Sequence, residues 1–232
     1  MKTHTILVSF LLITTFTIAQ ESKYYLGISY GKSFPLGDFT ANDINKSNAG
    51  FAESGTKLDV YGGYILSKHI TFTFTFRYQN FNTNINALTN GLETNNQGTV
   101  FIGNSNSWQI YSLLGGIAYK VSISKKFSLF PRIGFGPMLV SCPQFSIIAT
   151  NENTYTEING SSETGIGLGY EFGIGLKRNL GKNFCLMPTF TFSGGFVTIS
   201  DVDTTVDNAV TTSNYKPKIS TFNLGLSLAY KF

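Results

Sequence analysis

Four charged residues interrupt stretches of sequence that otherwise alternate between apolar and small or neutral residues. They are Asp59, Arg77, Arg132 and Glu171. If the chain turns back around Lys68, Asp59 lies opposite Arg77 on the neighbouring strand. Arg132 and Glu171 lie at similar distances from the short connection nearest to each of them. Because buried charges must be paired or hydrogen-bonded, we predict two ion pairs, Asp59–Arg77 and Arg132–Glu171, on an enclosed face.

Other residues that could support chemistry are few and poorly spaced. A hydrolase needs a base near its nucleophile, but the two histidines are His4, near the N-terminus, and His69, in a short connection. The glycines of 165–175 repeat at every second position, unlike the G-x-G-x-x-G of a nucleotide-binding loop. Cys142 and Cys185 fall at opposite ends of the expected strands, so we expect no disulfide. Without metal-ligand spacing, the sequence predicts no catalytic residue, cofactor or metal, and therefore no enzyme.

The first nineteen residues have the pattern of a secretory signal peptide. A short basic start precedes an apolar run over 6–16, and small residues then lead to Ala19 and Gln20. The run is too short for a transmembrane helix, which needs about 20 apolar residues. We therefore predict a signal peptide at 1–19 and a single domain at 20–232.

Eight later segments alternate with a period of two, which is typical of β-strands. In the clearest, large apolar residues occupy the even positions from Ile70 to Tyr78, and polar residues the odd ones. The eight segments are 23–34, 56–66, 70–81, 108–121, 127–139, 165–176, 184–196 and 222–232. Short connections (67–69, 122–126, 177–183) alternate with long ones (35–54, 82–106, 142–163, 198–216). This arrangement predicts an all-β, antiparallel, up-and-down meander of eight strands.

The composition indicates that the apolar face of this sheet points outward. Charged residues are 13% of the chain and aromatic residues 15%, whereas soluble proteins carry about 25% charged residues. The other face is rich in glycine and threonine, which suits the narrow interior of an eight-stranded barrel. A closed barrel also satisfies every backbone group in hydrocarbon. We therefore predict a transmembrane β-barrel, with Tyr24, Tyr119 and Tyr230 at one rim and Tyr78 and Trp108 at the other.

Charge divides between the two ends of this barrel. Ten acidic residues fall in the long connections, with only Lys46 and Lys216 to offset them, whereas the short connections are basic and contain no acid. The net charge of +4 is too small to indicate nucleic-acid binding.

The chain resembles the outer-membrane protein β-barrel domain family, small relatives of the OmpA and OmpX type in Gram-negative bacteria. The resemblance rests on the ending LGLSLAYKF and on GISYGKSFPLGDF near the start of the barrel. It implies location in the outer membrane, and an assembly signal at Leu228, Tyr230 and Phe232 that the barrel assembly machinery reads. Some small barrels modify lipid A with a serine and a histidine at the outer rim, where this chain has no histidine.

We therefore expect a non-enzymatic outer-membrane protein that displays long polar extracellular loops for surface interaction or envelope integrity. The alternative is a small pore for ions or polar solutes, and a lipid-modifying enzyme has less support. The lumen ion pairs fit a structural plug in the first case and a gate in the second. The expected partners are outer-membrane lipid and lipopolysaccharide, the assembly machinery during insertion, and an extracellular partner that the sequence does not identify. We expect a monomer.

Overall fold

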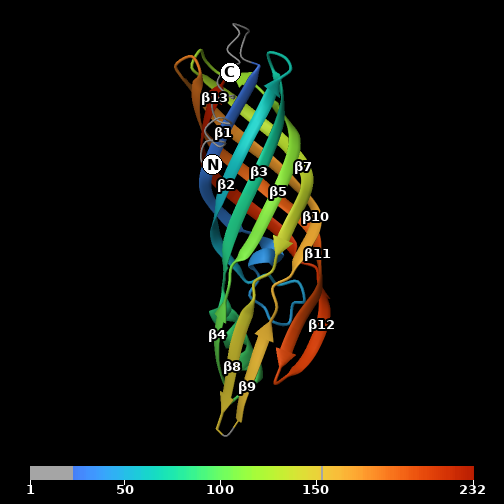
Figure 1. The fold of residues 1–232 in the computed structure, drawn as a ribbon. Coiled ribbons are helices and arrows are strands. Elements are labelled where there is room, and N and C mark those ends of the chain that lie inside the picture. The colour runs from blue at the N-terminus through green and yellow to red at the C-terminus, as the bar shows by residue number, and fades with distance from the viewer. Residues whose placement is uncertain (1–22, 153) are drawn as a thin grey trace, which may run out of the picture.

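The computed structural model describes residues 23–152 and 154–232, and its main feature is a closed ring of eight antiparallel strands (Figure 1). Each corresponds to one of the eight predicted segments. The predicted signal peptide at 1–19 lies outside the described residues. The eight strands are β1 (Tyr24–Pro35), β2 (Ala52–Ile65), β3 (Ile70–Thr83), β5 (Trp108–Tyr119), β7 (Phe127–Ser141), β10 (Thr164–Leu180), β11 (Phe184–Val206) and β13 (Lys218–Lys231).

The ring closes between its first and last strands. Each strand pairs with the next along the barrel, and β1 pairs with β13 from Tyr25 opposite Lys231 to Pro35 opposite Thr221. The predicted eight-stranded, up-and-down antiparallel barrel is therefore confirmed. Closure leaves no free strand edge in the wall, as hydrocarbon requires. None of the helices in the part of the chain that the structure describes is long and apolar enough to span a bilayer.

The side chains alternate between the outside and the interior as the sequence predicted. On β3, Phe72, Phe74 and Phe76 are exposed, whereas Arg77 and Gln79 are buried. The outward apolar band ends at a row of polar cross-strand neighbours: Lys32, Thr56, Asn80, Gln109, Ser141 and Thr164. At about 3.4 Å per residue and a tilt of about 40°, the segment from Ile70 to Tyr78 covers roughly 21 Å, close to the apolar band of known barrels.

The prediction that Trp108 lies at the outer rim is wrong. Trp108 is 2% exposed and points into the barrel, because it has the same strand parity as the buried Ile110. Its Nε1 donates a hydrogen bond to the carbonyl oxygen of Gly50 at 2.9 Å. Tyr78 faces outward as predicted, and its hydroxyl accepts a hydrogen bond from Asn80 at 3.3 Å.

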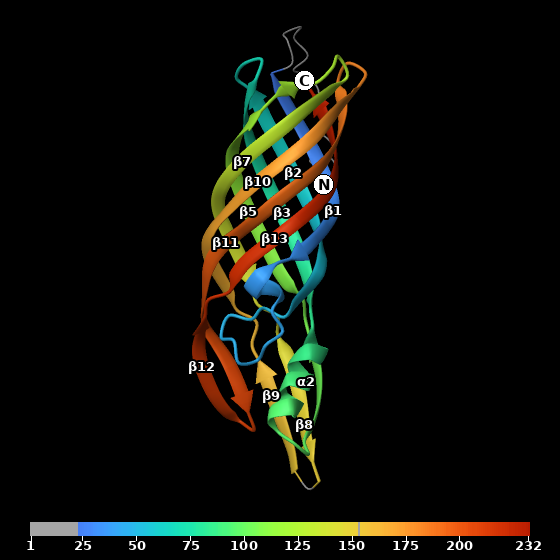
Figure 2. The ribbon, with the colours of Figure 1, turned by 180° about the vertical axis from the view of Figure 1, so that it is seen from behind.

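The two ends of the barrel differ. The turn end carries the short connections, the small strand β6 (Val121–Ser122) and both ends of the barrel chain, at Tyr24 and Phe232. The opposite loop end continues into an ordered extension beyond the barrel (Figures 1 and 2). The extension consists of α2 (Ile85–Asn95), β4 (Val100–Ser105), β8 (Phe145–Asn151), β9 (Thr154–Gly160) and β12 (Ala209–Tyr215).

The extension forms because long barrel strands are prolonged into a second sheet. β11 is 23 residues long and pairs with both β9 and β12 beyond the barrel. The β11–β12 hairpin turns at Asp207 and Asn208, whose φ angles are 45° and 75°, as a two-residue type I′ turn requires. Helix α2 begins at Asn84, whose side chain accepts a hydrogen bond from the Ala87 amide at 3.0 Å.

Candidate functional site

The lumen contains a connected cluster of five charged side chains. Arg77 Nε lies 2.8 Å from Asp59 Oδ1, and its Nη2 donates to Asp59 Oδ2 at 3.1 Å. Lys57 Nζ lies 2.6 Å from the same carboxylate. Arg132 Nε lies 2.7 Å from Glu171 Oε1. Arg77 Nη2 also contacts Glu171, so the two predicted pairs, both present, join into one network.

The register of neighbouring strands explains the two predicted contacts. Asp59 lies directly opposite Arg77 in the β2–β3 pair. In the β7–β10 pair, Arg132 lies opposite Gly173, and Glu171 lies opposite Gly134. Arg132 and Glu171 are therefore diagonal neighbours, within reach of long side chains.

Sequence reasoning missed two features of the cluster. Lys57 has the same strand parity as Asp59 and lies two residues before it, so its inward direction could have been recognised. The Arg77–Glu171 contact could not have been recognised from the sequence, because β3 and β10 are not paired and meet only across the lumen. Arg77 is 0% exposed, Lys57 and Asp59 are each 1% exposed, and Glu171 is 3% exposed. Removing one member of such a buried cluster leaves another charge without its partner.

Towards the loop end, a layer of neutral polar residues follows the charged cluster. Ser33 donates a hydrogen bond to Asn223 Oδ1 at 2.6 Å, and Gln79 Nε2 donates to the same oxygen at 2.9 Å. Asn223 Nδ2 donates to Ser193 Oγ at 3.0 Å. These side chains come from four different strands, β1, β3, β11 and β13, and are joined by hydrogen bonds inside the barrel.

An apolar plug lies beyond the polar layer and closes the loop end. The short 3₁₀ helix η1 (Gly37–Thr40) lies at this end of the barrel (Figure 2) and carries the fully buried Phe39. The Phe39 ring packs edge-on against Phe81 at 5.2 Å and Trp108 at 5.4 Å between centroids. The other members of the plug are Ala52, Ile110, Met138, Val140, Cys142, Val197, Ile199 and Ile219.

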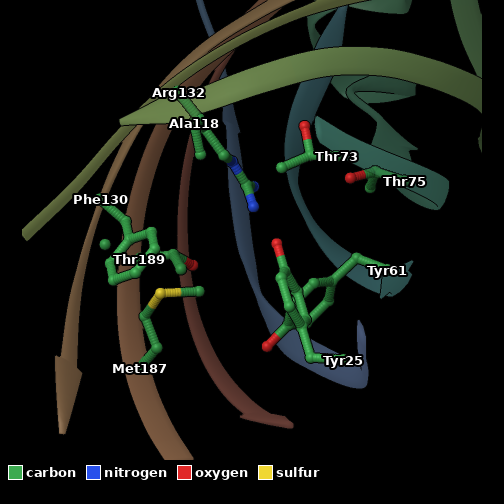
Figure 3. A pocket seen from close by; sticks show the side chains of 10 residues that line it. Tyr25, Tyr61, Thr73, Thr75, Ala118, Phe130, Arg132, Met187 and Thr189 are labelled. Carbon is green, nitrogen blue, oxygen red and sulfur yellow. The ribbon is translucent and has the colours of Figure 1, made fainter. Parts of the chain in front are cut away.

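On the turn-end side of the charged cluster, the lumen contains a small cavity (Figure 3). Its volume is ≈ 20 Å³, which is enough for about one water-sized particle. Lys177 lies at its margin, with Nζ 5.9 Å from the ring centroid of Tyr25 and 4.9 Å from that of Phe130. The lumen is therefore packed with side chains, as expected for eight strands.

The model of the outer membrane protein β-barrel domain family matches residues 5–232. The chain belongs to this family. Membership implies location in the outer membrane of the Gram-negative cell envelope, and the exposed apolar band of the barrel is the surface that meets lipid.

Several solved structures are similar to this family member at low sequence identity. The attachment invasion locus protein Ail of Yersinia pestis is 18% identical, covering 92% of this chain and 100% of its own, with a TM-score of 0.43. Neisserial surface protein A is 15% identical, with 90% and 97% covered and a TM-score of 0.40. A major outer membrane protein of Thermus thermophilus is 13% identical, with 90% and 99% covered and a TM-score of 0.48. No curated protein matches the chain.

The predicted assembly signal forms the outer face of the closing strand. Leu228, Tyr230 and Phe232 are all exposed. The Tyr230 ring packs edge-on against Phe184 at 5.1 Å, and the Phe232 ring stacks on Tyr24 at 6.2 Å. Recognition of these residues by the assembly machinery stays a prediction from the resemblance.

The remaining candidate residues lie apart from the lumen cluster. His69 is at the turn end, where its ring stacks on Tyr119 at 5.6 Å. Cys142 and Cys185 are both buried free thiols, and burial raises the pKa of Cys142, beyond the end of β7. Across 23–152 and 154–232, no three or more His, Cys, Asp or Glu side chains gather as metal ligands.

Proposed function

We propose that this outer-membrane protein is a non-enzymatic scaffold that holds an ordered extension outside the cell for surface interaction or envelope integrity. The observation that carries this proposal is the contrast between the two parts of the molecule. The lumen is filled by charged, polar and apolar layers, whereas the loop end builds a folded sheet and helix beyond the membrane band (Figure 1). Loops and extensions on a rigid scaffold commonly carry recognition.

The charge distribution supports an orientation with the extension outside. The short turns carry Lys68, Lys125, Lys126 and Lys182, and ten of the 13 acidic residues fall in the long connections. Short turns on the periplasmic side and long loops outside are typical of bacterial barrels. Lys32, in the polar row at the edge of the apolar band, would then face the phosphate groups of lipopolysaccharide.

The contact surface that we propose is the uncovered face of the sheet formed by β4, β8 and β9. The other face of this sheet packs against α2 through Phe101, Ile147 and Ala149. The uncovered face presents Ile102, which is 70% exposed, and Tyr155, which is 64% exposed. Exposed apolar side chains grouped on one face of an aqueous domain are typical of interaction sites.

A replacement of the β8–β9 hairpin tests this proposal. Residues 146–159 are exchanged for Asn-Gly, a two-residue turn that suits a hairpin, because Phe145 and Gly160, which then flank the turn, are already paired. Cells carrying this variant are compared with wild-type and gene-deleted cells for adhesion to host or matrix surfaces and for detergent sensitivity. Surface labelling and heat-dependent gel mobility show whether the barrel is inserted. The proposal expects an inserted variant to behave like the deletion, and wild-type behaviour in both assays would contradict it.

Two point variants give this comparison a matched control. Ile102→Ser changes the proposed contact face, and Val210→Ser changes β12, where Val210 is 61% exposed. Both replace an exposed apolar residue of the extension with serine. Only Ile102→Ser is expected to shift adhesion or detergent sensitivity toward that of the gene-deleted cells.

The second candidate function is a small pore, which one observation favours. Arg77 contacts both Asp59 and Glu171, so its guanidinium could exchange between two carboxylates and open a path beside them. This function expects discrete conductance steps that change in Arg77→Ala or Arg132→Ala. The apolar plug around Phe39 would also have to move, and for this reason we favour the scaffold.

A further inference from the structure

The lumen cluster carries an unbalanced positive charge. Its cations are Lys57, Arg77 and Arg132, and its carboxylates are Asp59 and Glu171. Three cations and two carboxylates leave one positive charge in excess. Within a barrel surrounded by lipid, an uncompensated buried charge is costly. A counter-ion inside the lumen would remove this cost.

The small cavity lies directly beside the excess charge. Arg132 uses its Nε for Glu171, and its side chain extends into the cavity toward Tyr25 and Tyr61 (Figure 3). The Tyr25 hydroxyl points toward the Arg132 guanidinium, whereas the Tyr61 hydroxyl points away from it (Figure 3) and lies beside Ser227. Tyr25 is therefore the tyrosine whose hydroxyl can donate a hydrogen bond to an anion held by Arg132.

The remaining cavity wall suits an anion. None of the lining residues, all of which the structure describes, carries a carboxylate. Besides Arg132 and Tyr61, the hydroxyls of the lining are those of Tyr25, Thr73, Thr75 and Thr189, of which Thr189 already donates to the carbonyl oxygen of Gly225 at 3.3 Å. The cavity volume of ≈ 20 Å³ suits a single small particle.

We propose that the lumen binds one small monovalent anion, of which chloride is the natural example, between Arg132 and the Tyr25 hydroxyl. The anion acts as the counter-ion of the charged cluster. The basic turn end would favour its entry, because Lys177 lies beside Tyr25 and Phe130 at the margin of the cavity and attracts negative ions.

Thermal unfolding of the refolded mature protein in a non-ionic detergent tests this site. Sodium chloride is exchanged for sodium gluconate at constant ionic strength, because gluconate is too large for the cavity. A ligand bound only by the folded state raises the Tm progressively with its concentration. We expect the Tm to rise by a few degrees with chloride and with bromide. An equal Tm at every chloride-to-gluconate ratio would overturn the proposal.

Matched variants locate the effect. Tyr25→Phe removes only the hydroxyl that faces Arg132 and is expected to reduce the chloride shift, and Arg132→Gln is expected to abolish it. The controls are Tyr30→Phe, on the lipid face, and Arg178→Gln, at the exposed turn end. These controls should respond to chloride as the wild type does, and a loss of the shift in them would refute the assignment to this cavity.

Crystals grown in sodium bromide keep the proposal testable if Arg132→Gln does not fold. The wild-type protein should show an anomalous bromide peak within hydrogen-bond reach of Arg132 and Tyr25. Density in the cavity without anomalous signal would mean that water alone occupies it, and the proposal would be wrong.

Discussion

Asp59 is the carboxylate on which the lumen cluster depends most, and Asp59→Asn tests that dependence. The Asp59 carboxylate forms ion pairs with Lys57 Nζ at 2.6 Å and with Arg77 Nε at 2.8 Å. The substitution keeps the size of the side chain but removes its charge, so the buried Lys57 ammonium loses its ion-pair partner. Arg77 keeps Glu171 as an ion-pair partner. Breaking a buried ion pair by removing one partner costs about 3–5 kcal/mol, and we expect a loss of unfolding free energy of this size.

The single tryptophan of the chain supplies the assay. Trp108 is buried in the apolar plug, so its fluorescence reports unfolding of the barrel during a urea titration in lipid vesicles. Asp43→Asn, on an exposed loop residue, serves as the control and should lose less than about 0.5 kcal/mol.

The double variant Lys57→Met/Asp59→Asn separates a broken pair from a general polar defect. If the cost comes from the unpaired Lys57, removing that lysine recovers part of the stability, and the two effects are non-additive by about 0.5–3 kcal/mol. A loss below about 1 kcal/mol for Asp59→Asn, or additive effects in the double variant, would refute the reasoning.

Three further substitutions test the barrel wall and the extension. Gly31→Ala would place a Cβ against the backbone carbonyl of Leu224, whereas Gly115→Ala meets no atom. We expect the first to lower the unfolding free energy by about 1–3 kcal/mol and the second to be nearly neutral, and equal urea midpoints would contradict this account. Asn84→Ala removes the acceptor for the Ala87 amide and should destabilise α2 by about 1 kcal/mol. Faster amide exchange confined to the extension would show this effect, and unchanged exchange in α2 would argue against the cap.

The barrel wall was predictable because the alternation of apolar and polar residues is local and repeats from strand to strand. The alternation from Ile70 to Tyr78 fixes which side chains face lipid. The short turn around Lys68 fixes the register that brings Asp59 opposite Arg77. The exception is Trp108, which parity places inside. The preference of tryptophan for membrane interfaces led to the opposite prediction.

The extension and the connected cluster were less predictable because they depend on contacts between distant segments. The large apolar residues of α2, Ile85, Leu88 and Leu92, are partly buried against a sheet from other connections. β4 and β8 pair although about forty residues separate them. The Arg77–Glu171 contact crosses the lumen between unpaired strands, which no pairwise register describes.

If layers of side chains close the barrel, ions cannot cross it, and single-channel recording of the refolded mature protein in a planar bilayer measures this property. Protease protection of the barrel strands would establish that the protein is inserted. Phe39→Ala, which opens the plug, serves as the comparison variant. The inserted wild type should show no discrete conductance steps. Regular open steps in the wild type, altered by Arg77→Ala or Arg132→Ala, would contradict the closed scaffold and establish the pore.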